Sequence, residues 1–249
     1  MIKYIEENNI GQLTLNRPEK RNALHPELVT QIKLKLNEIS SNKDIKVLIL
    51  TGEGKSFCAG ADLEYLNQLS KFNSIQNEKD SESLAELFLG LYNLQIPTIA
   101  AVSGSAIAGG CGLATVCDFI IADKATAKFG YSEVKIGFIP AIVSVFLIRK
   151  IGEGKARQLL LTGDVIDAQR SYEIGLADMI SDNVLEDAKI FAEKLISNSS
   201  LGMKLTKKMI SDISNLSVKD AVDYCIRLNT ISRSSDDFKK GLEKFFLKK

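Results

Sequence analysis

The sequence predicts an α/β fold built on parallel strands that are joined by helices. Three observations point to it: aliphatic and β-branched runs at 47–52, 98–104 and 119–123, amphipathic helical stretches between them, and a purely helical pattern after about residue 190. Alternation of strands and helices favours a parallel sheet with helical crossovers. With 249 residues, of which 45% are hydrophobic, the chain is long enough to bury a large core.

The N-terminal part of the chain supplies a hairpin, a helix and a strand. Alternating residues in IKYIEENNIGQLTLN predict two strands around a turn at Asn8 and Asn9. HPELVTQIKLKLNEISSN has apolar residues at helical spacing between Pro26 and Asn42, which predicts a helix. VLILTG has the composition of a buried strand that ends in glycine. Residues 70–80 are polar and unpatterned, so we expect a loop or a frayed helix there.

The remaining chain alternates and then becomes helical. A helix is expected around residues 81–94, followed by the strand TIAAVSG, a loop of small residues, the helical segment CGLATVCD, the strand FIIAD and a short strand in KATAKFG. After about residue 190 the sequence is rich in Lys and Ser and has no strand of its own. We therefore divide the chain into an α/β core, 1–190, and a C-terminal helical region, 191–249, that packs on the core or on a neighbouring subunit.

Charge and composition exclude several classes of function. The 32 Lys and Arg residues balance 31 Asp and Glu residues, so the net charge of +1 gives no general attraction to nucleic acid or anionic membranes. The N-terminal sequence is not typical of a secretory signal, and no stretch approaches the ~20 apolar residues of a membrane helix. The four cysteines form no C-x-x-C pair, which is typical of reduced packing thiols. We expect a cytoplasmic protein with no nucleic-acid or membrane partner.

Two segments of small residues follow predicted strands, KSFCAGADL at 55–63 and GSAIAGGCGLA at 104–114. A strand that runs through small residues into a helix leaves free backbone N–H groups near one point. Two such groups that converge on one oxygen would form an oxyanion hole for a carbonyl that gains charge during a reaction. The segments do not have the G-K-[ST] of a P-loop or the G-x-G-x-x-G of a dinucleotide fold.

Five blocks of the sequence resemble one known family. They are NRPEKRNAL, FCAGADL, IAAVSGSAIAGGCGLATVCDF, FGYSEVKIGFIP and LTGDVIDAQRSYEIGLAD, in the order and spacing of the crotonase, or enoyl-CoA hydratase/isomerase, superfamily. The resemblance implies a crotonase-type spiral of ββα units with a C-terminal helical trimerisation region, assembled as a homotrimer or a dimer of trimers. It also implies acyl-CoA thioester substrates. Coenzyme A is then part of the substrate, and neither a separate cofactor nor a metal is expected.

The resemblance assigns roles to a few residues. The amides of Ala61 and Gly109 would form the oxyanion hole, with Gly110 beside them, and Glu133 would be the acid/base. Family hydratases carry a second glutamate on the helix after the glycines, and that position is Gly112 here. A carboxylate near apolar walls would have a raised pKa that suits proton transfer.

Two reactions fit a site with one glutamate. The methylglutaconyl-CoA hydratase-like branch of the family is similar to this chain in three motifs, GGCGLATVCD, EVKIGFIP and ADLEYL. We therefore favour a lyase of fatty acid metabolism that adds water across the 2,3 double bond of an enoyl-CoA, such as a branched or carboxylated enoyl-CoA. A Δ3,Δ2-enoyl-CoA isomerase, which needs one base, is the alternative, and a decarboxylase or thioesterase-like reaction is a smaller one. In a hydratase, water would be held by Glu64, Tyr65 or Tyr131, by a second water, or by a substrate carboxylate in the space that Gly112 leaves.

The resemblance also suggests contacts to CoA, whose phosphates attract basic groups. The candidates are Lys20, Arg21, Ala59, Phe245 and Lys248, the last two reaching CoA from a neighbouring subunit.

Other polar residues are expected to be structural. Asp118 ends a helical segment and is expected to be a structural hydrogen-bonding group. His25, the single histidine, is expected to cap a helix or face solvent, so no Ser-His-Asp triad or His-rich metal site is predicted. A non-catalytic acyl-CoA or RNA-binding protein is the alternative of another class. The neutral charge of the chain and its retained Glu133 argue against it.

Overall fold

The computed structural model describes residues 1–247, apart from the side chains of residues 244 and 245. A six-stranded sheet has the order β1-β2-β3-β4-β6-β9, in which β1 and β2 are antiparallel and every later neighbour is parallel. The strands are β1 (Ile2–Glu7), β2 (Ile10–Leu15), β3 (Val47–Gly52), β4 (Thr98–Val102), β6 (Phe119–Asp123) and β9 (Met179–Ser181). This arrangement confirms the predicted α/β class.

A smaller sheet lies beside the first one and carries the segment that leads to the candidate site. It joins β5 (Ser105–Ile107), β7 (Lys128–Gly130) and β8 (Val165–Asp167), with β5 parallel and β8 antiparallel to β7. The sequence predicts β7, from Lys128 and Phe129 before Gly130, but it predicts neither β5, which lies in the segment expected to be a loop of small residues, nor β8.

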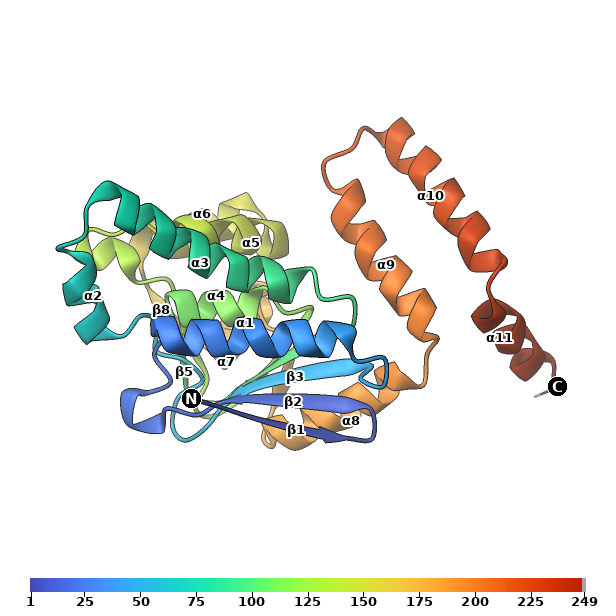
Figure 1. Cartoon of the computed structure of the whole chain (residues 1–249), viewed down its shortest axis with the longest axis horizontal. Helices are drawn as coiled ribbons and strands as arrows, with labels where there is room; N and C mark the ends of the chain where they lie inside the picture. Colours follow the sequence, from blue (N-terminus) through green and yellow to red (C-terminus); the bar gives the residue numbers. More distant parts are fainter. Residues whose placement is uncertain (248–249) are drawn as a thin grey trace.

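Helices cover both faces of the large sheet. On one face, α1 (Pro26–Ser41) and α3 (Ser74–Tyr92) lie side by side (Figure 1), and Leu28, Ile32 and Phe88 join the core cluster under them. On the other face, Ala188 and neighbouring apolar residues of α8 (Val184–Ile196) pack on strands β2, β3, β4 and β6. Burying one leucine or isoleucine side chain contributes about 1.5–3 kcal/mol to the stability of the fold. The helices on the two faces therefore hold the sheet between them.

Helix α3 begins earlier than the sequence predicts. Residues 74–80, expected as loop or frayed helix, form its first turns. Asn73 caps these turns by accepting from the amide of Gln76, while the Gln76 side chain accepts from the amide of Asn73. This reciprocal capping box satisfies amides at the start of a helix whose first turns are too polar to show an apolar stripe.

Shorter helices complete the part of the molecule that surrounds the two sheets, residues 1–196, which we call the body. They are the 3-10 turns η1 (Pro18–Lys20) and η2 (Glu133–Ile136), and α2 (Leu63–Leu69), α4 (Gly109–Thr115), α5 (Ala141–Ile151), α6 (Glu153–Thr162) and α7 (Ala168–Glu173). Both small-residue segments of the sequence run into helices, the first into α2 and the second into α4, as expected. Over the described residues, no helix is both long enough and apolar enough to cross a membrane.

The C-terminal helices α9 (Ser200–Ile213), α10 (Val218–Arg233) and α11 (Asp236–Leu247) form an arm that extends away from the body (Figure 1). Helix α9 is tied to the body by Lys207, whose Nζ donates to Asp118 at 2.7 Å and to the carbonyl oxygen of Ile96 at 3.0 Å. Neither α9 nor α10 has a buried residue. The arm is the helical C-terminal region that the sequence predicts, and residue 190 itself falls within α8, which packs on the sheet.

Candidate functional site

The two small-residue segments lie against each other, although they follow different strands. The amide of Cys58 donates to the carbonyl oxygen of Ser105 at 3.0 Å, and the amide of Ile107 donates to that of Cys58 at 3.0 Å. Cys58 and Ala106 therefore form a parallel bridge. This bridge holds the loop after β3 next to the loop after β5.

Glycine is required at three points of this contact. Gly104 has a φ of +70°, and a Cβ there would lie 2.0 Å from the backbone oxygen of Lys55. A Cβ on Gly110 would lie 2.1 Å from the backbone oxygen of Cys58, well inside van der Waals contact. Gly60 has a φ of +88°, and a Cβ there would lie 2.9 Å from the backbone oxygen of Ile107. The small residues thus serve a close approach of two backbones as well as a turn.

Ala61 presents a free amide at this contact. The amide of Leu24 donates to Gly60 at 2.7 Å and the amide of Asp62 donates back to Leu24 at 2.9 Å, so residues on both sides of Ala61 are held. Within the described part of the chain, the Ala61 N–H has no acceptor in either the backbone or the side chains.

Gly109 presents a second free amide. It is the first residue of α4, so its N–H has no partner inside the helix, and none is found elsewhere in residues 1–247. The preceding Ala108 holds it in place with an unusual backbone, φ 50° and ψ −124°, while its own amide donates to Gly130 at 2.7 Å. Strain of this kind costs on the order of 1–3 kcal/mol and is concentrated at functional sites.

Glu133 is the buried carboxylate of the region. It begins η2 directly after β7, the strand that pairs with β5, and it is 8% exposed. Its Oε2 atom is buried and has no hydrogen-bond partner among the described residues. Burial raises the pKa of this carboxyl above its ordinary value, as the sequence analysis anticipates.

Gly112 does not leave an open space. A Cβ on this residue would lie 2.3 Å from Cγ1 of Val143 and 3.2 Å from two ring atoms of Phe88. The expectation that a substrate carboxylate occupies room beside Gly112 is therefore wrong, because two buried apolar side chains fill it.

The side chains expected to hold a water molecule are engaged elsewhere. Tyr131 is fully buried, and its hydroxyl lies 2.6 Å from the hydroxyl of Thr115. The Tyr65 hydroxyl bonds Asp80 of α3. Glu64 is 78% exposed at its side chain and pairs with Lys20, with 2.6 Å between Nζ and Oε1.

The structure describes some of the residues that are expected to contact CoA. Lys20 and Arg21 are exposed and lie next to the Ala61 segment, since the amide of Ala59 donates to the carbonyl oxygen of Arg21 at 3.0 Å. The side chain of Phe245 and all of Lys248 lie outside the described residues.

Sequence reasoning missed the residues that hold this loop. Arg17 forms a buried ion pair with Asp62, at 3.1 Å, and Asp62 in turn caps α2 by accepting from the amide of Glu64. The buried Asn22 donates to the backbone oxygens of Glu53 and Ser56. The only signal in the sequence is that Arg17 and Asn22 belong to the first family-like block.

The two expected structural residues behave as predicted. His25 caps α1 by accepting from the amide of Glu27, and Asp118 accepts from both the amide and the hydroxyl of Thr98. Across the residues that the structure describes, no group of three His, Cys, Asp or Glu side chains could hold a metal ion.

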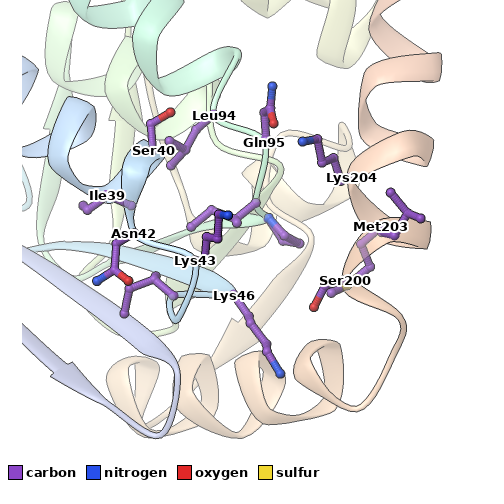
Figure 2. A pocket seen from close by; sticks show the side chains of 14 residues that line it. Ile39, Ser40, Asn42, Lys43, Lys46, Leu94, Gln95, Ser200, Met203 and Lys204 are labelled. Atoms are coloured by element: carbon purple, nitrogen blue, oxygen red, sulfur yellow. The ribbon is translucent and has the colours of Figure 1, made fainter. Parts of the chain in front are cut away.

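Two surface cavities flank the first helix of the arm, and neither is lined by a predicted site residue. The one in Figure 2, of about 220 Å³, lies between the end of α1, the segment before β4 and the start of α9, and includes Lys43, Lys46 and Lys204. The other, of about 580 Å³, lies along α9 near the Lys207–Asp118 pair. The candidate site consists of the two loops in contact, with the free amides of Ala61 and Gly109, and of Glu133, which follows the strand paired with β5.

Comparison with solved structures defines the class of protein. An enoyl-CoA hydratase from Shewanella pealeana matches 100% of this chain and 94% of its own, with a TM-score of 0.95 at 32% identity. A structure from Legionella pneumophila, assigned to the enoyl-CoA hydratase/isomerase (crotonase) group, covers 100% of this chain and 96% of its own with a TM-score of 0.92 at 34% identity. The protein has the crotonase fold.

Comparison of sequences then gives the family. Residues 5–249 match the enoyl-CoA hydratase/isomerase family. A crotonyl-CoA hydratase of Syntrophomonas wolfei is 32% identical over 249 residues, 98% of this chain and 94% of its own. A short-chain-enoyl-CoA hydratase of Clostridium acetobutylicum is 35% identical over 210 residues, 83% of this chain and 79% of its own. The chain belongs to the enoyl-CoA hydratase/isomerase family and is an enzyme of it.

Proposed function

We propose that this enzyme adds water across the 2,3 double bond of an enoyl-CoA thioester, using two backbone amides and one carboxylate. Two relatives named as a crotonyl-CoA hydratase and a short-chain-enoyl-CoA hydratase support this reaction. The observation that carries the proposal is the buried Oε2 of Glu133, which has no partner in the described part of the chain and is free to accept from a water molecule.

The thioester oxygen would accept from the amides of Ala61 and Gly109. Both N–H groups are free among the described residues, and the Cys58–Ala106 bridge holds their loops together. When an oxygen nucleophile adds at C3, the electrons of the 2,3 double bond shift toward the carbonyl and form an enolate. Two fixed donors stabilise this developing negative charge more strongly than they stabilise the neutral thioester.

Glu133 would carry the proton. Its carboxylate removes a proton from water as the hydroxyl adds to C3, and the resulting carboxylic acid returns a proton to C2 of the enolate. The sum of the two steps is the addition of one water, and Glu133 ends ionised as it began. A pKa raised by burial favours both proton transfers. The carboxylate is a stronger base toward water than an exposed glutamate is, and the carboxylic acid still returns its proton to C2.

Replacing Glu133 tests the proposal. For Glu133→Gln we expect kcat for crotonyl-CoA hydration to fall by about 10²–10⁴-fold, the usual contribution of a general acid/base. Hydration is followed by the loss of ultraviolet absorbance of the conjugated thioester. In the wild type, kcat/KM should fall as the pH drops through the Glu133 pKa, so this limb lies above about 4.3, the ordinary value for glutamate.

Glu173→Gln is the matched control, because Glu173 is a surface carboxylate on α7 that pairs with Arg170. Its kcat should match that of the wild type. Unchanged hydration in Glu133→Gln would remove this residue from the mechanism.

A Δ3,Δ2-enoyl-CoA isomerase is the second candidate, and the glycine at position 112 favours it, since isomerisation between C4 and C2 needs a single base. A 3-enoyl-CoA substrate separates the two reactions. Absorbance that appears from this substrate indicates isomerisation, whereas absorbance lost from crotonyl-CoA indicates hydration. A branched or carboxylated substrate such as 3-methylglutaconyl-CoA belongs in the same panel.

We also propose that the protein assembles as a homotrimer or a dimer of trimers through its C-terminal arm. The outward faces of this arm carry exposed apolar side chains, including Val218, Val222 and Ile226. A cytoplasmic location is proposed because Cys58, Cys111, Cys117 and Cys225 are all free thiols, which are typical of a reducing compartment. Lys20 and Arg21 are proposed to contact the CoA phosphates.

A further inference from the structure

Arg17 joins the two segments that meet at Ala61. Its Nη1 atom donates to the carbonyl oxygen of Ala23 at 2.8 Å, and its Nη2 atom donates to Oδ2 of Asp62 at 3.1 Å. Leu24 follows Ala23 and forms a parallel bridge with Ala61. Asp62 is the residue directly after Ala61. One guanidinium group therefore holds both sides of this bridge.

The bridge sets the direction of the Ala61 N–H. This N–H and the carbonyl of Gly60 belong to one peptide group, and none of the peptide bonds in the described chain is cis. In a planar trans peptide the C=O and N–H bonds point in opposite directions. The Gly60 oxygen accepts from the amide of Leu24 at 2.7 Å, so the Ala61 N–H points away from Leu24. A shift of the Leu24 segment would turn this N–H.

The peptide group needs such a restraint, because Gly60 has a φ of +88° and glycine has access to more backbone conformations than other residues. The Arg17 and Asp62 side chains are only 11% and 6% exposed, so water and salt screen their attraction little. The second oxygen of Asp62 accepts from the amide of Glu64 at 3.0 Å. The backbone of Arg17 is fixed in turn, because its amide donates to the buried Asn22 side chain at 2.8 Å.

We propose that Arg17 is a positioning residue of the oxyanion hole, which fixes the direction of the Ala61 N–H by holding Ala23 and Asp62 together. Arg17 acts through these two residues and the Leu24–Ala61 bridge. The inference rests on the proposed function, because it concerns one of the two amides that would bind the thioester oxygen.

The test uses the carbonyl stretching frequency of bound butyryl-CoA that carries ¹³C at the thioester carbon. Hydrogen bonds weaken the C=O bond and lower this frequency, so isotope-edited infrared difference spectra report the donors. Butyryl-CoA has no 2,3 double bond to hydrate, so the measurement needs no turnover. In the wild type we expect a lower frequency for the bound thioester than for free butyryl-CoA in solution.

Arg17→Met keeps an unbranched apolar side chain and removes both donors. Its downshift should shrink to about half or less of the wild-type value, because one of the two amides is no longer aimed at the oxygen. We expect kcat for crotonyl-CoA to fall by about 10–10²-fold, the scale of a small misplacement in a catalytic site. The Kd of butyryl-CoA should stay within a few-fold of the wild type, since the CoA part of the ligand is untouched.

Two milder variants test the same contacts. Arg17→Lys keeps the charge but not the planar fork that reaches two acceptors, so it should give an intermediate downshift. Asp62→Asn has one acceptor oxygen in place of two, which cannot serve both Arg17 and the amide of Glu64. Combined with Arg17→Met, it should remove no more of the downshift than Arg17→Met alone, because both changes break one interaction.

Two controls separate the aim of the amide from charge and from stability. Arg157→Met removes an exposed guanidinium that pairs with Glu153 on α6, and its spectrum and kcat should match the wild type. Ile39→Val removes one buried carbon near the end of α1, so its melting temperature should fall while its downshift is unchanged. An equal loss of downshift in Ile39→Val and Arg17→Met would assign the effect to stability and overturn the inference.

The outcomes distinguish this inference from the proposed function. Circular dichroism shows which variants are folded, and Arg17→Lys and Asp62→Asn carry the test if Arg17→Met is unfolded. A full wild-type downshift in the folded variants overturns the positioning role. The absence of a downshift in the wild type overturns it as well, together with the oxyanion hole. If the wild type shows the downshift and the Arg17 variants lose it, but no substrate is hydrated, Arg17 positions the amide and only the proposed reaction fails.

Discussion

Glu133 shows how a functional group can cost the folded state stability. Its carboxyl is buried, and one oxygen has no partner in the described structure. Burial raises its pKa in the folded protein, whereas in the unfolded chain it has an ordinary value near about 4.3. Between these two values the folded state binds more protons than the unfolded state, so stability falls as the pH rises through this window.

Glu133→Gln should therefore be more stable than the wild type above the folded pKa of Glu133. At such a pH the wild type must keep an ion buried, and glutamine removes that charge while it keeps the shape. Below about pH 4.3 the wild-type carboxyl is neutral in both states, and the difference between the two proteins should disappear. Thermal melts at pH 8 and pH 4 measure it. An equal gain at both pH values would assign the effect to packing instead of charge.

Gly110 lies at a close approach between the backbones of the two loops. Gly110→Ala should disrupt the pairing of the two loops, because its Cβ would lie 2.1 Å from the Cys58 oxygen and backbone atoms cannot move aside cheaply. Overpacking of this kind costs about 1–3 kcal/mol or more, and crotonyl-CoA hydration should fall with it. Urea unfolding measures the stability.

Gly154→Ala gives the comparison for Gly110→Ala. Gly154 lies in α6 and an added Cβ meets no atom within 4 Å, so alanine should stabilise that helix by up to about 1 kcal/mol. Equal effects of the two changes would mean that the loop contact is not tight.

At the residue scale, the sequence shows which residues are small, but it does not show which side chains fill the space beside them. The glycine at position 112 is visible in the sequence, and so is the missing carboxylate. Val143 and Phe88 come from distant helices and reach this point only through packing, so no local pattern could reveal them. The same holds for Tyr131, whose bond to Thr115 joins segments on either side of β6.

At the element scale, long periodic segments are predictable and short ones are not. Helix α1 spans Pro26–Ser41 and the strand VLILTG is β3, as their patterns predict. The strand β9, Met179–Ser181, is not predicted from the sequence, because its three residues are defined as a strand by their pairing with β6 and not by a local pattern. The hairpin turn is predictable because Asn8 and Asn9 both adopt positive φ, which asparagine tolerates well.

Helix α9 has no fully buried side chain, and Lys207 makes polar contacts between this helix and the body. Lys207→Met keeps the aliphatic stem but removes donors to Asp118 and Ile96, and it leaves the Asp118 carboxylate with one partner fewer. We expect the amides of α9 to exchange hydrogen faster, with little change in the sheet. Hydrogen exchange followed by mass spectrometry measures this.

Lys208→Met is the comparison on α9, because Lys208 is exposed and bonds Asp212 of the same helix. Its exchange pattern should be close to that of the wild type. If Lys207→Met leaves α9 equally protected, the arm is held by contacts other than this ion pair.

At the scale of the whole molecule, the body buries an apolar core, whereas the arm leaves apolar side chains exposed. The sheet is covered on both faces, whereas α10 exposes Val218, Val222 and Ile226 at four-residue spacing. An exposed apolar stripe of this kind is typical of an interaction site. The sequence predicts helices rich in Lys and Ser here, and it predicts that they pack on the core or on a neighbouring subunit. Which surface covers the exposed side chains is not encoded in a local pattern.

Val222→Asp combined with Ile226→Asp tests whether this face joins copies of the chain. The two residues are four apart on α10 and share one face, so two carboxylates would have to be desolvated in any contact. We expect the wild type to have a mass of three or six times 27.3 kDa and the variant to be smaller, by size-exclusion chromatography with light scattering. Lys219→Glu, an exposed charge change on the same helix, should keep the wild-type mass. If the double variant also keeps it, the copies meet through another surface, and the exposed stripe of α10 needs a different partner.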